Sequence, residues 1–141
     1  MKSLLTILSF FLLQKSFAQD SIHVFRHYDN EKPTTSIDTF FYNIRNTVFV
    51  SLDEGFNDSL YITVNDAAVL NTYLRSNESI GYAGEFQIHF DNPSDTKILR
   101  LKFVNENFYI EEKVNLTYKS LQIRGLMPWL LVYTNHFPIR E

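Results

Sequence analysis

The sequence predicts an all-β fold, a single antiparallel β-sandwich of about seven strands with an immunoglobulin-like arrangement. Aromatic residues, mostly Phe and Tyr, make up 16% of the 141 residues, and these side chains favour strands. Short segments with alternating polar and apolar residues recur along the chain, separated by turn residues at intervals of about 8–12 residues. No segment repeats apolar residues with the period of an amphipathic helix.

Residues 1–18 have the three parts of a signal peptide. Lys2 provides the positive charge, residues 4–13 form a short apolar stretch, and a small-x-small cleavage pattern ends at Ala18. Removal of these 18 residues leaves 123 of the 141, residues 19–141, as one β-sandwich domain. We therefore expect an exported protein of the periplasm or cell surface, with no membrane span after cleavage.

The composition excludes several classes of function. Cleavage removes Lys2 and Lys15 and leaves 11 basic against 16 acidic residues without a basic stripe, so we expect no nucleic-acid partner. The chain has no Cys, which excludes disulfides, a cysteine nucleophile and a Cys-based zinc site. Glycine-rich phosphate loops and a G-x-S-x-G elbow are absent. We expect no enzymatic activity and no cofactor.

The expected strands follow from alternation and from β-branched or aromatic content. They cover residues 21–28, 37–42, 46–52, 59–64, 69–75, 82–90, 97–104 and 108–118. The pair 97–104 and 108–118 predicts a β-hairpin with a three-residue loop. The polar segments 29–36 and 91–95 predict loops, because Asp, Asn and Pro favour turns.

The apolar segment 126–133, with the sequence LMPWLLVY, has two interpretations. It is either a last core strand or an exposed patch for a partner. As a patch it presents Trp129, Leu130 and Tyr133 to a protein partner, and sheet edges beside such a patch commonly receive an added strand. Tyr61 and Tyr109 fall on the expected outward faces of their strands. Exposed aromatic rings also suit a polysaccharide ligand, although such rings are more often core or cross-strand pairs.

Polar side chains offer two further chemistries. The loops 53–58 and 91–95 contain Asp and Asn oxygens of the kind that calcium prefers, but neither has the EF-hand spacing, and both residue types are ordinary in turns. His89 lies close to Asp91, and such a pair can support general base catalysis. Because no nucleophile or glycine-rich oxyanion loop accompanies the pair, a small hydrolase is the lowest-ranked of the candidate functions.

His23 and His27, about 13 Å apart on one strand, cannot share a zinc ion, so we expect no metal.

Residues 46–64, NTVFVSLDEGFNDSLYITV, resemble a β-domain of the GldM/PorM family of Bacteroidota, whose members serve gliding motility and type IX secretion. The matching positions are Val48 and Val50 in the first strand, Gly55 and Asn57 in the turn, and Leu60, Ile62 and Val64 in the second strand. Asp58 replaces the proline that usually follows the Asn. The resemblance implies a β-sandwich for protein–protein contacts with no catalytic residues. Members also carry an uncleaved membrane helix and several domains, which this sequence does not show.

The sequence therefore favours an exported, non-enzymatic β-sandwich that mediates protein–protein interaction in the bacterial cell envelope. The alternative is a carbohydrate-binding module that uses exposed aromatic rings, with calcium as a further candidate ligand.

Overall fold

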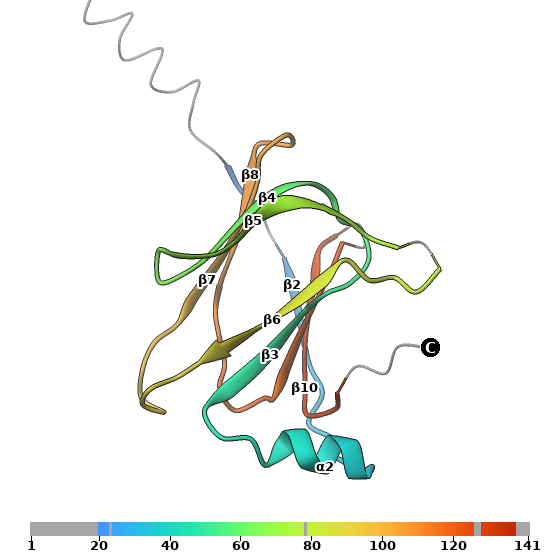
Figure 1. The fold of residues 1–141 in the computed structure, drawn as a ribbon, viewed down its shortest axis with the longest axis vertical. Coiled ribbons are helices and arrows are strands. Elements are labelled where there is room, and N and C mark those ends of the chain that lie inside the picture. The colour runs from blue at the N-terminus through green and yellow to red at the C-terminus, as the bar shows by residue number, and fades with distance from the viewer. Residues whose placement is uncertain (1–19, 23, 78, 126–127, 138–141) are drawn as a thin grey trace, which may run out of the picture.

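Figure 1 shows the computed structural model of the chain, which describes residues 20–22, 24–77, 79–125 and 128–137. The predicted signal peptide, residues 1–18, lies outside the described residues, as do His23 and the first two residues of the apolar segment 126–133. Among the described helices, none has the length and apolar character needed to cross a membrane.

Two five-stranded sheets and one short helix make up the described part of the chain. The elements are β1 (Asp20–Ser21), β2 (Phe25–Tyr28), α2 (Ser36–Tyr42), β3 (Thr47–Leu52), β4 (Asn57–Val64), β5 (Ala67–Arg75), β6 (Gly84–His89), β7 (Ile98–Phe103), β8 (Phe108–Lys113), β9 (Ser120–Arg124) and β10 (Leu130–Thr134). Sheet A has the strand order β1-β8-β7-β4-β5, and sheet B has the order β2-β10-β9-β3-β6. The predicted all-β class is confirmed.

One hydrophobic core joins the two sheets. Its members from β3, β4, β7, β8, β9 and β10 are Val48, Val50, Leu52, Leu60, Ile62, Leu99, Leu101, Phe103, Ile110, Leu121, Ile123, Leu131 and Tyr133. These residues alternate along each strand, because successive side chains of a strand point to opposite faces. The alternation of residues 59–64, 97–104 and 108–113 thus separates a buried face from an outer face in each strand. The predicted hairpin of β7 and β8 is confirmed, with residues 104–107 as its loop.

Strand direction differs from the prediction of an antiparallel sandwich. Three of the eight strand pairings are parallel, namely β1–β8, β2–β10 and β3–β9. Alternation reports which face of a strand is buried and carries no information on the direction of its neighbours. The described residues form ten strands against the expected seven or so, partly because segment 21–28 divides between β1 and β2, in different sheets.

Two elements were assigned wrongly from the sequence. Residues 37–42 were expected to form a strand, but the segment belongs to α2, where Thr39 N donates to Thr35 O and Asn43 N donates to Thr39 O. Such i to i−4 bonds define the helix, and a six-residue apolar run does not distinguish the two structures. The expected strand 108–118 ends at Lys113, and a separate strand, β9, follows at Ser120–Arg124 in the middle of sheet B.

Candidate functional site

Trp129, a predicted partner-binding residue, lies in the core between the two sheets. Its side chain is 8% exposed. The ring centroid lies 5.2 Å from that of Phe56, 5.0 Å from that of Phe103 and 6.2 Å from that of Phe108. Because the contacting rings belong to the sheet A side and Trp129 directly precedes β10 of sheet B, this residue links the sheets and presents no binding surface.

Tyr133 is fully buried, and its hydroxyl belongs to a polar network that leads from the core to Arg26 on the edge strand β2. Its hydroxyl donates to Glu112 Oε1 at 2.9 Å, and Arg26 Nε donates to Glu112 Oε2 at 2.7 Å. The Tyr28 ring stacks on Tyr133 with a centroid separation of 5.4 Å. Burial raises the pKa of the Tyr133 hydroxyl, and the negative charge of Glu112 adds to this. Among the described residues, the apolar segment is therefore mainly the last core strand.

The other three predicted residues lie on two different outer faces. Leu130 pairs with Phe25 at the edge of sheet B, where Leu130 is half-buried and Phe25 exposed. Tyr61 and Tyr109 lie on the outer face of sheet A, and both pair with Lys102 of the intervening strand β7. The five predicted residues are thus divided among the core and two faces, and they do not form one site.

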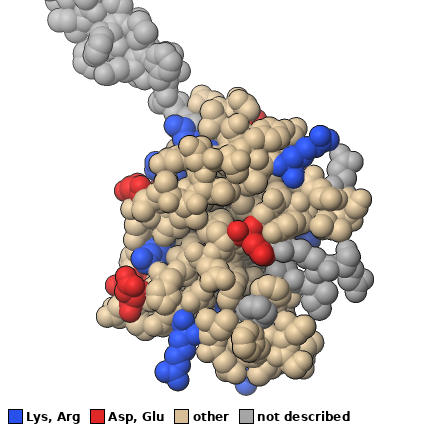
Figure 2. Space-filling model, in the orientation of Figure 1, with Lys and Arg blue, Asp and Glu red and all other residues tan. Residues whose placement is uncertain are grey.

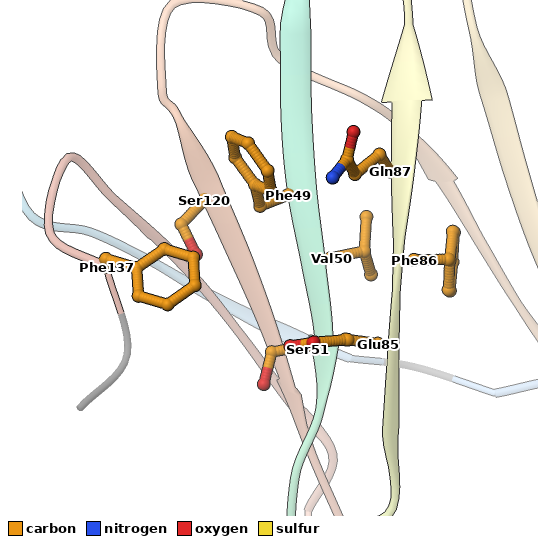
Figure 3. A pocket seen from close by; sticks show the side chains of 8 residues that line it. All are labelled: Phe49, Val50, Ser51, Glu85, Phe86, Gln87, Ser120 and Phe137. Carbon is orange, nitrogen blue, oxygen red and sulfur yellow. The ribbon is translucent and has the colours of Figure 1, made fainter. Parts of the chain in front are cut away.

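A hollow lies on the outer face of sheet B. Its volume is about 480 Å³. Figure 3 shows the residues that line it, from β3, β6, β9 and the segment after β10: Phe49, Val50, Ser51, Glu85, Phe86, Gln87, Ser120 and Phe137. The sequence did not indicate this site, because β9 was not recognised and its register with β3 was therefore unknown.

Strand register brings the polar and aromatic residues of the hollow together. Phe49 of β3 pairs with Gln87 of β6 on one side and with Ser120 of β9 on the other. All three lie on the outer face, because the neighbours of Phe49 in the chain, Val48 and Val50, are buried in the core. The hollow therefore spans three adjacent strands.

The hollow combines an aromatic wall with a buried hydroxyl group. The Phe137 ring stands edge-on to Phe49, with a centroid separation of 6.0 Å and an interplanar angle of 80°. Ser120 is 2% exposed, and its Oγ has no hydrogen-bond partner within the described residues. The Ser51 hydroxyl, in contrast, donates to Asp53 Oδ1. A buried polar atom without a partner is costly, so Ser120 is suited to a ligand that supplies the missing hydrogen bond.

The hollow borders a strand edge. Strand β6 is the last strand of sheet B in the described part of the chain. Phe90 N donates to Asn46 O across the pair of strands. The N–H groups of an antiparallel strand point alternately to its two sides. Because the N–H of Phe90 points toward β3, that of Gln87, three residues earlier, points away from β3 to the outer side of β6. This edge can accept a further strand.

The predicted His89–Asp91 pair is not seen. The Nδ1 atom of His89 lies 3.3 Å from the hydroxyl oxygen of Thr47, across β3 and β6. The described residues that line the hollow include no histidine.

In each of the two loops considered for calcium, one Asp carboxylate accepts hydrogen bonds within the fold. In loop 53–58, Asp58 is fully buried and accepts hydrogen bonds from three backbone N–H groups. In loop 91–95, Asp95 accepts from Asn92 N, which closes a turn. Among the described residues, three His, Asp or Glu side chains converge elsewhere, at Asp29, Glu31 and His136, which are far apart in the sequence.

Charges are interspersed on the visible face. In Figure 2, isolated basic and acidic side chains alternate over this face without a patch of one sign.

Comparison of the chain with protein-family models, with curated proteins and with solved structures finds no match. The resemblance of residues 46–64 to the GldM/PorM β-domains therefore stays a prediction.

Proposed function

We propose that this chain is an exported, non-enzymatic binding module of the bacterial cell envelope. Its ligand is an extended segment of a partner protein that pairs with the outer edge of β6 and inserts a side chain into the hollow. The observation that carries this proposal is the position of the hollow, directly beside an edge strand and with a buried Ser120 hydroxyl in its lining. The immunoglobulin-like arrangement and the family resemblance belong to the same proposal.

Strand addition explains why the hollow and the edge lie together. An added strand lies about 4.8 Å from β6, and every second side chain points to the outer face of sheet B. A large apolar side chain at such a position lies over β6 and enters the end of the hollow beside Gln87. Ser120 lies two strands beyond β6, about 10 Å away. A polar group that bonds Ser120 Oγ therefore comes from a part of the partner that crosses the outer face of sheet B. The carboxylate of Glu85, at the rim, favours a basic residue nearby in the partner segment.

Site-specific crosslinking in the native host tests the location of the partner. A photo-crosslinking amino acid replaces Gln87, which is exposed on β6, and in a control chain it replaces Lys102, which is exposed on the outer face of sheet A. We expect one envelope protein to be crosslinked at residue 87 and not at residue 102, with the crosslink mapped by mass spectrometry to an extended segment. Equal capture from both positions, or none from residue 87, contradicts the proposal.

A matched pair of variants tests strand addition itself. Gln87→Pro removes the outward N–H, whereas Gln87→Ala retains it and removes only the side chain. We expect a synthetic peptide of the mapped segment to bind the purified wild-type protein and Gln87→Ala, and to lose at least ~10-fold in affinity for Gln87→Pro, since backbone hydrogen bonds supply the affinity in this mode. Equal binding by the two variants contradicts strand addition.

Carbohydrate binding is the second candidate, supported by the outer face of sheet A. Tyr61 and Tyr109 both project from this face, two strands and therefore about 10 Å apart. Such rings can stack on sugars. Because Trp129 is buried, its fluorescence does not report directly on that face, and calorimetric titration with polysaccharides is the appropriate test. Binding that is lost in Tyr61→Ala and Tyr109→Ala supports this candidate, and the absence of heat for the wild-type protein argues against it.

A further inference from the structure

We propose that Asp29, Glu31 and His136 form a binding site for a transition-metal ion of the zinc class. The site lies where β2 and β10 end, at the edge of sheet B. One ligand atom from each side chain takes part, and these three atoms all lie within 4.8 Å of one another. The ligands come from opposite ends of the chain, so the parallel pairing of β2 with β10 creates the site.

The ligand atoms of Glu31 and His136 lie slightly farther apart than they would around a bound zinc ion. The His136 Nε2 atom lies 3.9 Å from Glu31 Oε2, which is longer than a hydrogen bond. Zinc bonds of about 2.0–2.2 Å in tetrahedral geometry hold neighbouring ligand atoms roughly 3.4 Å apart. The side chain of Glu31 is 82% exposed, so it can rotate into place without disturbing the core. A small rotation of this surface side chain therefore brings the Glu31 and His136 ligand atoms to the separation that zinc requires.

Hydrogen bonds already hold the ligands in position. Asp29 N donates to Tyr133 O at 2.8 Å, which extends the β2–β10 ladder, and Glu31 N donates to Asp29 Oδ1 at 2.9 Å. Thr134 Oγ1 donates to Asp29 Oδ2 at 3.2 Å and accepts from His136 N at 3.1 Å. Each of the three ligand residues is thus tied to a neighbour in the group. Such supporting bonds orient ligands at metal sites.

The donor set indicates the class of metal. Imidazole nitrogen and carboxylate oxygen are both zinc ligands, and a water molecule would complete four-coordination with these three side chains. Calcium is less suited, because it takes six to eight oxygen ligands.

Metal binding has a consequence for the hollow, which rests on the proposed function. Phe137 follows His136 directly and packs edge-on against Phe49 in the wall of the hollow. A metal ion that fixes His136 also restricts the position of Phe137. We expect zinc to strengthen peptide binding at the hollow, whereas binding of the metal itself does not depend on any ligand there.

Calorimetric titration of the tag-free, chelator-treated protein with zinc chloride tests the site. We expect one zinc ion per wild-type chain. Affinity should fall by at least ~10-fold in His136→Ala and in Glu31→Gln, because each loses a ligand. Glu31→Gln changes an exposed side chain, so it keeps the proposal testable if His136→Ala does not fold. His89→Ala, which alters an exposed histidine on β6, serves as the control and should bind zinc as the wild type does.

A second readout is the melting temperature, measured once with excess zinc and once with chelator. In the wild type and in His89→Ala, zinc should raise the melting temperature relative to chelator, whereas in Glu31→Gln the two temperatures should be equal. The proposal is wrong if the wild-type protein gives neither heat nor a melting shift, or if Glu31→Gln and His136→Ala bind zinc as tightly as the wild type. Either outcome leaves the hollow and its crosslinking test unaffected. Conversely, loss of peptide binding with normal zinc binding contradicts only the proposed function.

Discussion

At the scale of single residues, Trp129 lies in the core, although the apolar segment 126–133 that contains it also fitted a surface patch. Three phenylalanine rings from the sheet A side surround it. A change at Trp129 therefore alters the stability of the fold. Loss of partner binding in a Trp129 variant would not locate a binding surface, and Gln87 on β6 is the better position for that purpose.

We predict that Trp129→Ala lowers the free energy of unfolding by about 3–5 kcal/mol, because it leaves a cavity between the two sheets. Urea denaturation followed by circular dichroism measures this loss. Leu130→Ala is the matched control, since Leu130 is the next residue and lies half-buried on the outer face. Its loss should be clearly smaller. Equal losses in the two variants would contradict the core position of Trp129.

The network of Tyr133, Glu112 and Arg26 predicts a dependence of stability on alkaline pH. The pKa of the Tyr133 hydroxyl is raised in the folded protein by burial and by Glu112. Above about pH 10, an unfolded chain loses this proton while the folded chain retains it, so the folded state binds more protons. The free energy of unfolding therefore falls as the pH rises above about 10.

Tyr133→Phe should make this decline shallower, because it removes the titrating group. The variant should also be less stable at neutral pH by about 1–3 kcal/mol, since Glu112 loses a donor inside the core. Tyr61→Phe, which alters an exposed tyrosine, should keep the wild-type dependence. Urea denaturation at a series of pH values measures the slopes, and an unchanged slope in Tyr133→Phe would contradict the assignment.

At the scale of elements, two glycines allow the loop before β4 to contact the end of β9. Gly55 has a φ of +88°, and a Cβ atom there would collide with the backbone of Gly125. A Cβ atom on Gly125 would lie 2.8 Å from the Trp129 ring. Gly125 N donates to Glu54 O at 2.6 Å. The contact is therefore backbone on backbone, and any side chain at either glycine would separate the two elements.

We predict that Gly55→Ala costs at least about 2 kcal/mol of stability, since strain at a positive φ adds to the collision. Gly81→Ala is the control, because Gly81 also has a positive φ but has free space around an added Cβ atom. Its φ is +59°, and the nearest atom to an added Cβ is Glu54 Cβ at 3.8 Å. We expect a cost of about 1–2 kcal/mol there. Thermal melting compares the two variants, and a larger effect at Gly81 would contradict the packing of these elements.

At the scale of the whole molecule, the shared core couples the two sheets. Core residues from both sheets form one cluster, and Trp129 lies at their junction. Neither sheet can bury its inner face without the other, so we expect them to unfold together.

We predict that unfolding of the purified protein occurs in one cooperative transition. Circular dichroism reports the strands of both sheets, and the single Trp129 reports their junction. The two signals should give the same midpoint in urea. Separate midpoints would show that one sheet persists without the other, in contradiction of a common core.

The local pattern of the sequence determined the fold class and the buried face of most strands. The alternation of residues 97–104 separates Leu99, Leu101 and Phe103 from the face that carries Arg100 and Lys102, and the structure buries the first three. Alternation identifies the two faces because the pleat of a strand turns successive side chains to opposite sides, so a few neighbouring residues show which side chains share a face. Composition likewise excluded cysteine chemistry without any reference to three-dimensional structure.

Only the tertiary structure decided strand direction, strand order and the location of the candidate sites. Residues 126–133 have an apolar pattern that fits a core strand or a surface patch, and the choice depended on the sheet A rings that enclose Trp129. The hollow required the register of β3 with β6 and β9, and the cluster of Asp29, Glu31 and His136 required β2 to pair with β10. These arrangements depend on contacts between segments far apart in the chain, and a local pattern carries no information about which distant segment becomes the neighbour.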